Sequence, residues 1–406
     1  MRVKGKLLSD RVPRRQFLGA AAGLFGLAGA TRHAIARNLL GAFFGTQSAQ
    51  QARPDAREMI LYSRQYLTLE MPMSRLESWI TPVESFFVRN NLLMPNVDPS
   101  SWSLAVNGEV ERPLTFTFRE FMQLAPARVT NTIECAGNGR VNYQPRIGGV
   151  PWGRGGVGNA MFEGPRLAEV LRLAALKPTA RHVAFRGLDI VPKGASDFIR
   201  SIPIEKALDR NTLLATRMNG SPLTPEHGFP ARSLVPGWIG SASIKWLQEI
   251  QVLSHEYRGF YMDPGYRIPA AAASTDKSGQ ARTVSLTSLR VKSIIAEPAD
   301  GDRLTPTAQG TVTIRGASWA GEAAIARVEV STDGGVTWHP AELGPEHEKY
   351  AWRLWHYDWR PNRGGAFTVC SRATDDAGHT QPRKPLWNPG GYLWNGVDSV
   401  LVRVGN

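Results

Sequence analysis

The chain has 406 residues, of which 42% are hydrophobic and 20% charged. This length and balance predict an ordinary globular protein with two or three domains and ample core. The sequence contains two cysteines, Cys135 and Cys370, which exclude a disulfide framework. No Cys-x-x-Cys-His motif occurs, so we expect no haem attached covalently to this chain.

The formal net charge is +13. Residues 1–36 hold seven Lys or Arg and one Asp, a net charge of +6, which leaves +7 for the rest. A mildly basic mature protein suits an anionic substrate or an acidic electron-transfer partner. Because no run of Lys and Arg with interleaved aromatics occurs, nucleic acid is not an expected partner.

The N-terminal segment has the form of a twin-arginine signal peptide. Arg14 and Arg15 precede an apolar run from Leu18 to Ala30, and residues 34–36 supply an A-x-A cleavage site. The run is too short to span a bilayer, so we expect no stable membrane span in the mature chain. We predict a signal peptide at 1–36, a leader or linker at 37–60 and export of the folded protein to the periplasm. An ordinary N-terminal helix and an uncleaved anchor are the alternatives.

Residues 61–280 mix strand and helix signals. Trp102, Leu104 and Val106 alternate with small or polar residues, which predicts a strand. Residues 117–120 have the pattern of a capping box at the start of a short helix. Apolar residues at helical spacing predict a helix over 167–174. Further strands are predicted at 129–133, 182–185, 233–235 and 250–252.

After residues 269–283, which are rich in Ala, Ser and Thr and predict a linker, the pattern changes to short strands. Val312 and Ile314 alternate with polar residues, and residues 333–335 give a hairpin turn between strands at 325–331 and 336–338. Strands at 350–359 and 366–373 complete an all-β sandwich, immunoglobulin-like in outline. Four tryptophans are expected in the core or an interface: Trp319, Trp338, Trp352 and Trp355.

The most informative stretch surrounds Cys135. A β-branched strand ends there, a glycine-rich bend follows, and Arg140 lies five residues on. Such a strand end can hold a thiolate at the mouth of a pocket, and a nearby arginine favours the metal-binding thiolate. A lone cysteine is more often a small buried hydrophobe, so this motif needs support from elsewhere.

That support is a resemblance. The stretch from Cys135 to Arg140 resembles the molybdenum-ligand motif of the sulfite oxidase family of molybdenum cofactor enzymes. Further blocks follow in the family's order, at residues 87–90, 187–189, 227–232, 235–237 and 245–247. The resemblance covers roughly residues 80–404. It implies an α+β protein: a mixed α/β sulfite-oxidase-type molybdopterin domain at 61–280, followed by an immunoglobulin-like dimerisation domain at 287–406.

The resemblance also implies a cofactor, a molybdenum-molybdopterin (Mo-pyranopterin), with Cys135 as the only protein ligand of the metal and no haem. Arg232 and Lys245 match the family's phosphate-side residues, helped by backbone N–H groups of the loop that includes Ser243 and Ile244. Asp189 and His227 match its partners of the pterin ring edge. A strip along the cofactor is matched by Phe87, Val88, Arg89, Asn90 and Asn91.

Around the substrate, Arg89 and Arg140 match two arginines of the family, Tyr266 matches its active-site tyrosine and Trp152 matches a pocket-wall tryptophan. The chain departs from the pattern twice. Gly390 stands where the family often has a third pocket arginine, and Asn91 where a histidine is usual. One lost charge would weaken affinity for a dianion by about 1–2 kcal/mol, or signal a different substrate.

The activity implied is oxidation of sulfite to sulfate by oxygen-atom transfer at the cysteine-ligated cofactor, in a homodimer that passes electrons singly to a cytochrome c. Two other functions stay open. The chain could be the molybdenum subunit of a complex that oxidises sulfane sulfur or thiosulfate. It could also be an interaction protein that keeps the fold without the cofactor.

Overall fold

The computed structural model describes residues 58–270 and 282–405. The predicted signal peptide, most of the predicted leader and the middle of the predicted linker lie outside the described residues. Within the described part, no helix is long and apolar enough to cross a membrane. The first described strands, β1 (Ile60–Ser63) and β2 (Thr68–Glu70), pair antiparallel.

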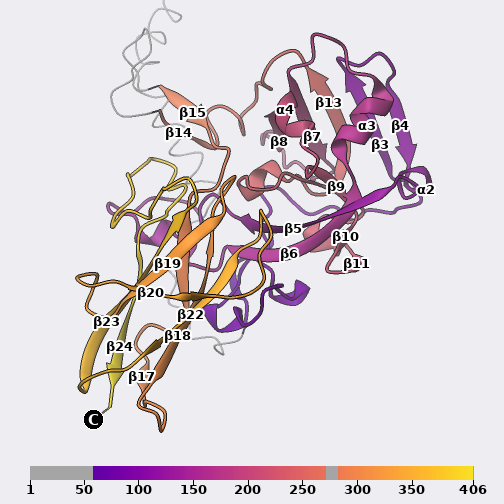
Figure 1. The fold of residues 1–406 in the computed structure, drawn as a ribbon. Coiled ribbons are helices and arrows are strands. Elements are labelled where there is room, and N and C mark those ends of the chain that lie inside the picture. Colours follow the sequence, from indigo (N-terminus) through magenta and orange to yellow (C-terminus); the bar gives the residue numbers. More distant parts are fainter. Residues whose placement is uncertain (1–57, 271–281, 406) are drawn as a thin grey trace, which may run out of the picture. The chain divides into compact units, whose positions relative to one another are not determined.

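A five-stranded mixed sheet forms one layer of the N-terminal region (Figure 1). Its strands, in spatial order, are β4 (Leu114–Thr117), β3 (Ser103–Gly108), β13 (Leu247–Leu253), β7 (His182–Gly187) and β8 (Ile199–Pro203). Strand β13 runs parallel to β3 and antiparallel to β7. Leu104 and Val106 are buried on β3 as their alternation predicts.

Short helices flank this sheet, and their ends follow local sequence rules. Helix α3 (Leu167–Ala174) buries residues 167, 170, 171 and 174, as the helical spacing predicts. Helix α2 (Phe118–Phe121) begins with the predicted capping box, in which Thr117 and Glu120 cap each other's backbone N–H groups. Helix α4 (Ile204–Ala207) follows β8 directly.

A second sheet carries the cysteine motif. Strands β5 (Pro126–Glu134) and β6 (Val157–Pro165) form a long antiparallel pair that β10 (Arg217–Met218) and β11 (Ser221–Pro222) extend. Strand β9 (Leu213–Ala215) pairs with β12 (Arg232–Leu234). Single 3-10 turns complete the region: η1 (Met73–Arg75), η2 (Val83–Ser85), η3 (Arg140–Asn142), η4 (Pro225–His227) and η5 (Gly240–Ala242).

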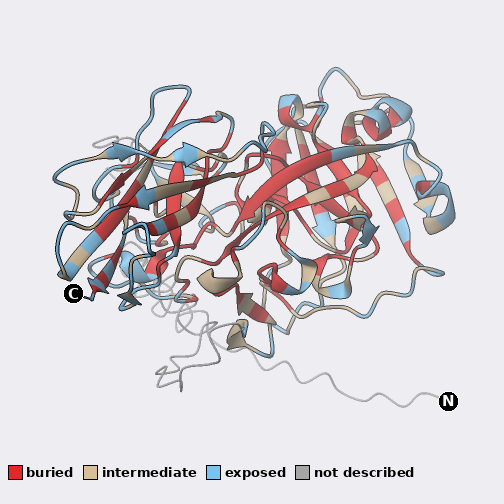
Figure 2. Ribbon diagram, turned by 60° about the horizontal axis from the view of Figure 1, so that its bottom comes forward, coloured by how far each residue is buried: buried red, intermediate tan, exposed pale blue. Residues whose placement is uncertain are grey.

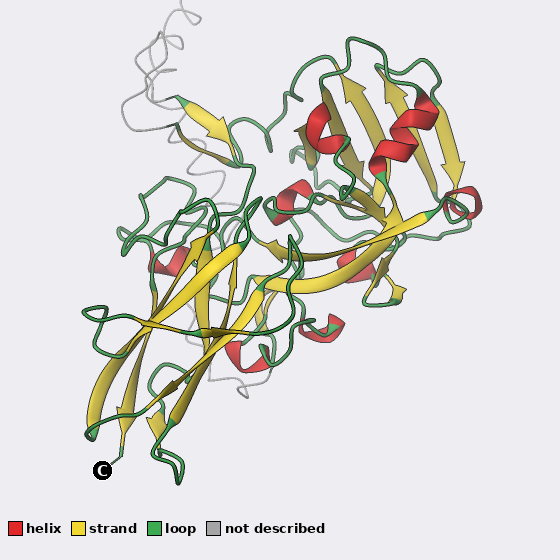
Figure 3. Ribbon diagram, in the orientation of Figure 1, coloured by secondary structure: helices red, strands yellow, loops and turns green. Residues whose placement is uncertain are grey.

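The C-terminal region is a two-sheet β-sandwich, drawn almost entirely as strands and loops in Figure 3. One sheet has the order β16 (Lys292–Glu297), β18 (Val312–Trp319), β22 (Arg353–Trp359) and β21 (Glu342–Leu343). The other has the order β17 (Arg303–Leu304), β24 (Asp398–Val404), β23 (Gly365–Asp375), β19 (Ile325–Ser331) and β20 (His339–Pro340). Their inner faces share one apolar core (Figure 2), so the predicted fold class is confirmed.

Two local predictions in this part need correction. Residues 336–338 form no strand, because the Asp333 carboxylate accepts hydrogen bonds from the backbone N–H groups of Val336 and Thr337 and prolongs the turn. The predicted linker also begins and ends in regular structure. Its first residue belongs to β14 (Arg267–Pro269) and its last to β15 (Thr283–Ser285), and these two strands pair antiparallel. Of the four tryptophans, Trp319, Trp352 and Trp355 are buried as expected.

Candidate active site

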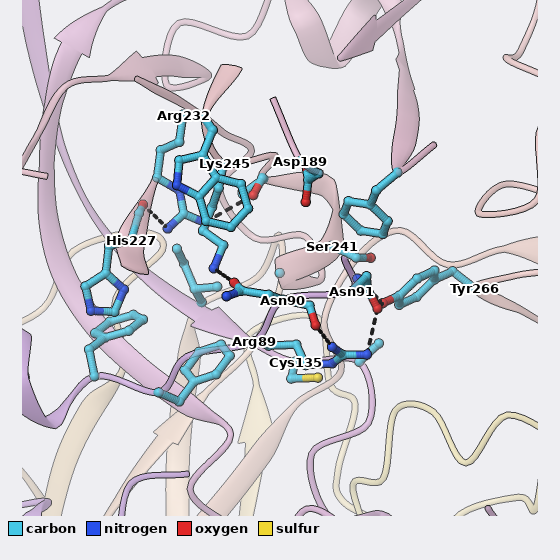
Figure 4. A pocket seen from close by; sticks show the side chains of 18 residues that line it. Arg89, Asn90, Asn91, Cys135, Asp189, His227, Arg232, Ser241, Lys245 and Tyr266 are labelled. Atoms are coloured by element: carbon cyan, nitrogen blue, oxygen red, sulfur yellow. Dashed lines mark hydrogen bonds between the residues drawn. The ribbon is translucent and has the colours of Figure 1, made fainter. Parts of the chain in front are cut away.

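A pocket opens beside the end of β5, with an empty space of about 680 Å³ that includes its part open to solvent. Figure 4 shows side chains from segments far apart in sequence converging on it. Eleven of the residues predicted as site residues line it: Phe87, Arg89, Asn90, Asn91, Cys135, Asp189, His227, Arg232, Ser243, Lys245 and Tyr266. Eleven residues predicted from separate motifs therefore share one pocket.

Cys135 is the first residue after β5, where the loop turns sharply. Its backbone N–H bonds to the Gly156 carbonyl at 2.8 Å, and its own carbonyl accepts from Asn138 N–H at 2.9 Å. Gly139 has a φ of 88°, and a Cβ there would strike the Trp394 ring, so only glycine fits. Burial raises the pKa of the Cys135 thiol, whereas the charges of Arg89 and Arg140 act to lower that pKa.

Two cations, the buried Arg232 and the half-buried Lys245, form the opposite wall. Arg232 donates to the carbonyls of His227 and Ser243, both at 3.1 Å, and Lys245 donates to the Glu226 carbonyl at 2.8 Å and to the Asn90 side chain. Within the described part of the chain neither forms an ion pair. Burial lowers the pKa of Arg232 to about 10 and holds that of Lys245 well below its ordinary value.

The pocket also contains polar atoms without partners. Asn90 Nδ2, Arg232 Nε and Ser241 Oγ are buried and form no hydrogen bond with any described residue. A buried donor left unpaired costs about 1–3 kcal/mol, so three around one cavity indicate a bound polar ligand. The cations of the pocket can bind a phosphate, and the polar donors between them can bind a polar ring system joined to that phosphate.

Two titratable groups stand near these cations. Burial raises the pKa of Asp189 to about 7, although the charge of Lys245 opposes the rise. Burial, with the charges of Lys245 and Arg232, lowers the pKa of His227 to about 3, so its ring is neutral at neutral pH. His227 Nε2 lies 3.3 Å from the Val83 carbonyl. Both groups can exchange hydrogen bonds with a ring edge; the histidine does so without charge, and the carboxyl can act in either protonation state near neutral pH.

Asn91 links the residues predicted to bind substrate. Its side-chain oxygen accepts from Arg89 Nη2 at 2.7 Å, and its amide nitrogen lies 3.1 Å from the Tyr266 hydroxyl (Figure 4). Burial raises the pKa of Tyr266, so the phenol stays protonated and can donate. The residue that stands where a histidine was expected therefore orients the arginine and the tyrosine together.

Four predicted site residues do not line the pocket. Arg140 instead directs its guanidinium to the carbonyls of Val150, at 2.9 Å, and Gly390, at 3.1 Å. Trp152 is fully buried and meets the rings of Tyr62 and Phe87 edge-on. Val88 and Ile244 are buried in packed interior. Backbone carbonyls hold Arg140 and neighbouring rings hold Trp152 outside the lining of this pocket, and their substrate roles stay predictions.

The pocket also has lining residues that sequence reasoning missed, among them Phe86, Phe198, Ser241 and Trp246. Phe86, Ser241 and Trp246 lie within two residues of predicted positions, so widening each motif by two would have found them. Phe198 carries no such signal. Trp246 adopts a φ of 50°, uncommon for a bulky residue, and its ring lies 4.8 Å from Lys245 Nζ.

With this geometry in place, comparison with known proteins identifies the class. The oxidoreductase molybdopterin binding domain matches residues 91–261, and the Mo-co oxidoreductase dimerisation domain matches residues 283–404. Mitochondrial sulfite oxidase of Rattus norvegicus is 36% identical over 343 residues, covering 81% of this chain and 62% of that protein. Sulfite oxidase of Gallus gallus is 34% identical over 332 residues, covering 78% and 72%.

A solved structure agrees. The sulfane dehydrogenase SoxCD from Paracoccus pantotrophus superposes with a TM-score of 0.74 at 26% identity, covering 89% of this chain and 95% of that one. The chain belongs to the sulfite oxidase family of molybdenum enzymes. Its cofactor is a molybdenum-pyranopterin. The chain spans about 62% of the length of the mammalian relatives it matches.

The residues of the pocket fit this cofactor. Cys135 offers a soft sulfur ligand, which suits molybdenum, while the unpaired Arg232 and Lys245 would hold a phosphate. Among the described residues no group of three or more His, Cys, Asp or Glu side chains could hold a metal ion. The orphaned Asn90 and Ser241 atoms supply donors for the organic part.

Proposed function

We propose that this protein oxidises sulfite to sulfate. The reaction takes sulfite and water to sulfate, two protons and two electrons. The observation that carries the proposal is the placing of Cys135, Arg89 and Tyr266 around one end of a single pocket whose other end holds Arg232 and Lys245. The cysteine side offers a metal ligand beside hydrogen-bond donors to an anion, as oxidation of a small sulfur oxyanion requires.

Different residues of the chain bind the substrate and the cofactor. The bound cofactor supplies oxygen-atom transfer and accepts two electrons. Arg89 and the protonated Tyr266 hydroxyl bind the oxyanion oxygens, and Asn91 holds both at fixed separation. Arg232 and Lys245 anchor the cofactor through its phosphate. The electrons leave one at a time to a cytochrome c.

A second candidate keeps the cofactor and changes the substrate to a sulfane sulfur carried by another protein. Arg140, a predicted substrate arginine, is engaged by the Gly390 carbonyl, and position 390 itself supplies no charge. A pocket with less positive charge would suit a substrate less anionic than sulfite. The structural similarity to a sulfane dehydrogenase supports this reading.

The decisive experiment measures molybdenum content beside cytochrome c reduction with sulfite and, separately, with a carrier-bound sulfane sulfur. Cys135→Ala should retain the fold and lose turnover with either substrate. Cys370→Ala is the matched control, because Cys370 is buried in β23 away from the pocket, and it should keep turnover. Full sulfite oxidation by Cys135→Ala would refute the proposal, and turnover of the carrier-bound substrate alone would favour the second candidate.

We further propose a periplasmic homodimer exported by the twin-arginine route. The dimerisation-domain match supports the oligomeric state, and Arg14 and Arg15 support the export route. Mass spectrometry of the exported protein should find an N-terminus near residue 37, and sedimentation should give twice the chain mass. Replacing both arginines by Lys should retain the protein in the cytoplasm.

A further inference from the structure

One buried cation near the pocket belongs to none of the roles above. Arg200 lies on β8 with 2% of its surface exposed. Its Nη1 donates to the Tyr261 carbonyl and its Nη2 to the Leu286 carbonyl at 3.2 Å, whereas its Nε has no partner. Across the described residues it forms no ion pair with a carboxylate. Burial lowers the pKa of Arg200 only to about 10, so it stays charged at neutral pH.

The guanidinium covers one face of the Tyr266 ring. Arg200 Cζ lies 5.1 Å from the ring centroid. Tyr266 also stacks on Tyr392, with centroids 5.4 Å apart and an interplanar angle of 17°. Arg140 Cζ then lies 5.6 Å from the Tyr392 centroid. Each of the two stacked tyrosines therefore contacts a cation, and Tyr266 lines the pocket.

The backbone at Tyr266 needs such support. Its φ is 52°, a conformation that is strained for a bulky residue and persists only when its surroundings fix it. Leu286 N–H bonds to the Tyr266 carbonyl at 2.8 Å, and the Leu286 carbonyl accepts from Arg200. The same short segment thus fixes the backbone of Tyr266 and the cation over its ring.

We propose that Arg200 is a positioning residue of the substrate site, which fixes the Tyr266 ring and strengthens its hydroxyl as a hydrogen-bond donor to a small oxyanion. A cation over an aromatic face withdraws electron density from the ring, which makes a phenolic O–H a better donor. Because Arg200 has no carboxylate partner, its charge is not cancelled locally. Arg200 therefore supplies positive potential beside Tyr266, in a pocket where the glycine at position 390 carries no charge.

This inference rests on the proposed function only in taking an oxyanion as the ligand, so its test uses binding as well as turnover. The variants are Arg200→Met, Arg200→Gln and Arg200→Lys, each made in the wild type and in Tyr266→Phe. Molybdenum content, thermal stability, sulfate affinity by calorimetry, and KM and kcat for sulfite are measured for each. The Gln side chain of Arg200→Gln still offers N–H donors to the Tyr261 and Leu286 carbonyls. If Arg200→Met does not fold, the measurements on Arg200→Gln test the proposal instead.

Removing the charge should weaken sulfate binding and raise KM for sulfite by about tenfold, with kcat changed by less than about threefold. Arg200→Lys should stay within about threefold of the wild type. In Tyr266→Phe the effect of Arg200→Gln should fall below about twofold, because no hydroxyl remains to be strengthened. Unchanged affinity, or an equal loss in both backgrounds, would overturn the inference.

The two proposals fail differently. A wild type that binds sulfate without oxidising sulfite would refute the proposed function and leave the Arg200 comparison intact. A wild type that oxidises sulfite while Arg200→Gln changes neither KM nor sulfate affinity would refute only the role of Arg200.

Discussion

The cations of two regions of this molecule, the β5 junction and the pocket, differ in their partners. At the junction of β5 with the sandwich, Lys292 meets the Glu134 carboxylate at 2.7 Å, and Trp319 donates to the same carboxylate at 2.9 Å. At the pocket, Arg232 is buried and Lys245 is half-buried, and both are held by carbonyls or an amide. Throughout the described residues these two form no ion pair.

The difference shows which of these cations already have a countercharge within the protein. An ion pair that is buried and hydrogen-bonded balances its own desolvation, whereas a cation held by dipoles alone still needs an anion. The junction is therefore a structural contact that ties the strand before Cys135 to β16 and β18. The pocket is a binding site whose cations receive their countercharge from the bound ligand. Each prediction below tests this contrast.

The largest effect is expected at the junction. Glu134→Gln would leave Lys292 buried without a countercharge and should destabilise the fold by about 3–5 kcal/mol in denaturant unfolding. The double variant Glu134→Gln with Lys292→Met should recover much of that loss, because no unpaired charge then remains. A single variant within about 1 kcal/mol of the wild type would show that the pair is not structural.

The next effect concerns pH. The folded pKa of His227 is about 3, below its unfolded value of about 6.5, so the unfolded state binds more protons between these values. Stability should fall as pH decreases through that window, by up to about 1.4 kcal/mol per pH unit from this group. His227→Gln should flatten the profile of unfolding free energy between pH 6.5 and 4. An equally steep profile in the variant would assign the acid sensitivity to other groups.

A smaller effect on stability is expected at the pocket wall. Arg232→Met removes a buried charge that has no carboxylate partner, so the cofactor-free protein should lose no more than about 1 kcal/mol. The same variant should bind molybdenum cofactor poorly, which metal analysis would measure. Lys206→Met is a useful comparison, since Lys206 pairs with Glu322 away from the pocket and should leave molybdenum content unchanged. Loss of stability as large as that of Glu134→Gln would remove the distinction between the regions.

The smallest effect is expected for an exposed ion pair. Arg315 and Glu297 lie 2.8 Å apart, with side chains 33% and 51% exposed. Glu297→Gln should change the unfolding free energy by less than about 1 kcal/mol, and high salt should reduce even that. A change as large as that at Glu134 would mean that burial does not decide the strength of these pairs.

Sequence alone determined the local elements. The alternation at Leu104 and Val106, the spacing of helix α3 and the capping box at Thr117 are confirmed, because each depends on residues within one turn or one strand. The turn at Asp333 was found, but not its length, since that depends on which N–H groups one carboxylate captures. Resemblance to the family, and not periodicity, predicted the residues that share the pocket: 87, 89–91, 135, 189, 227, 232, 243, 245 and 266.

Tertiary structure alone decided where the cations point. Arg140 was predicted from its place beside Cys135, yet its guanidinium turned to the carbonyl of Gly390, 250 residues away. Arg200 and Glu134 carry no motif, because their roles depend on Tyr266, Lys292 and Trp319 from distant segments. A sequence pattern records which side chains are available, but the free energy of a buried charge depends on the atoms that folding places around it.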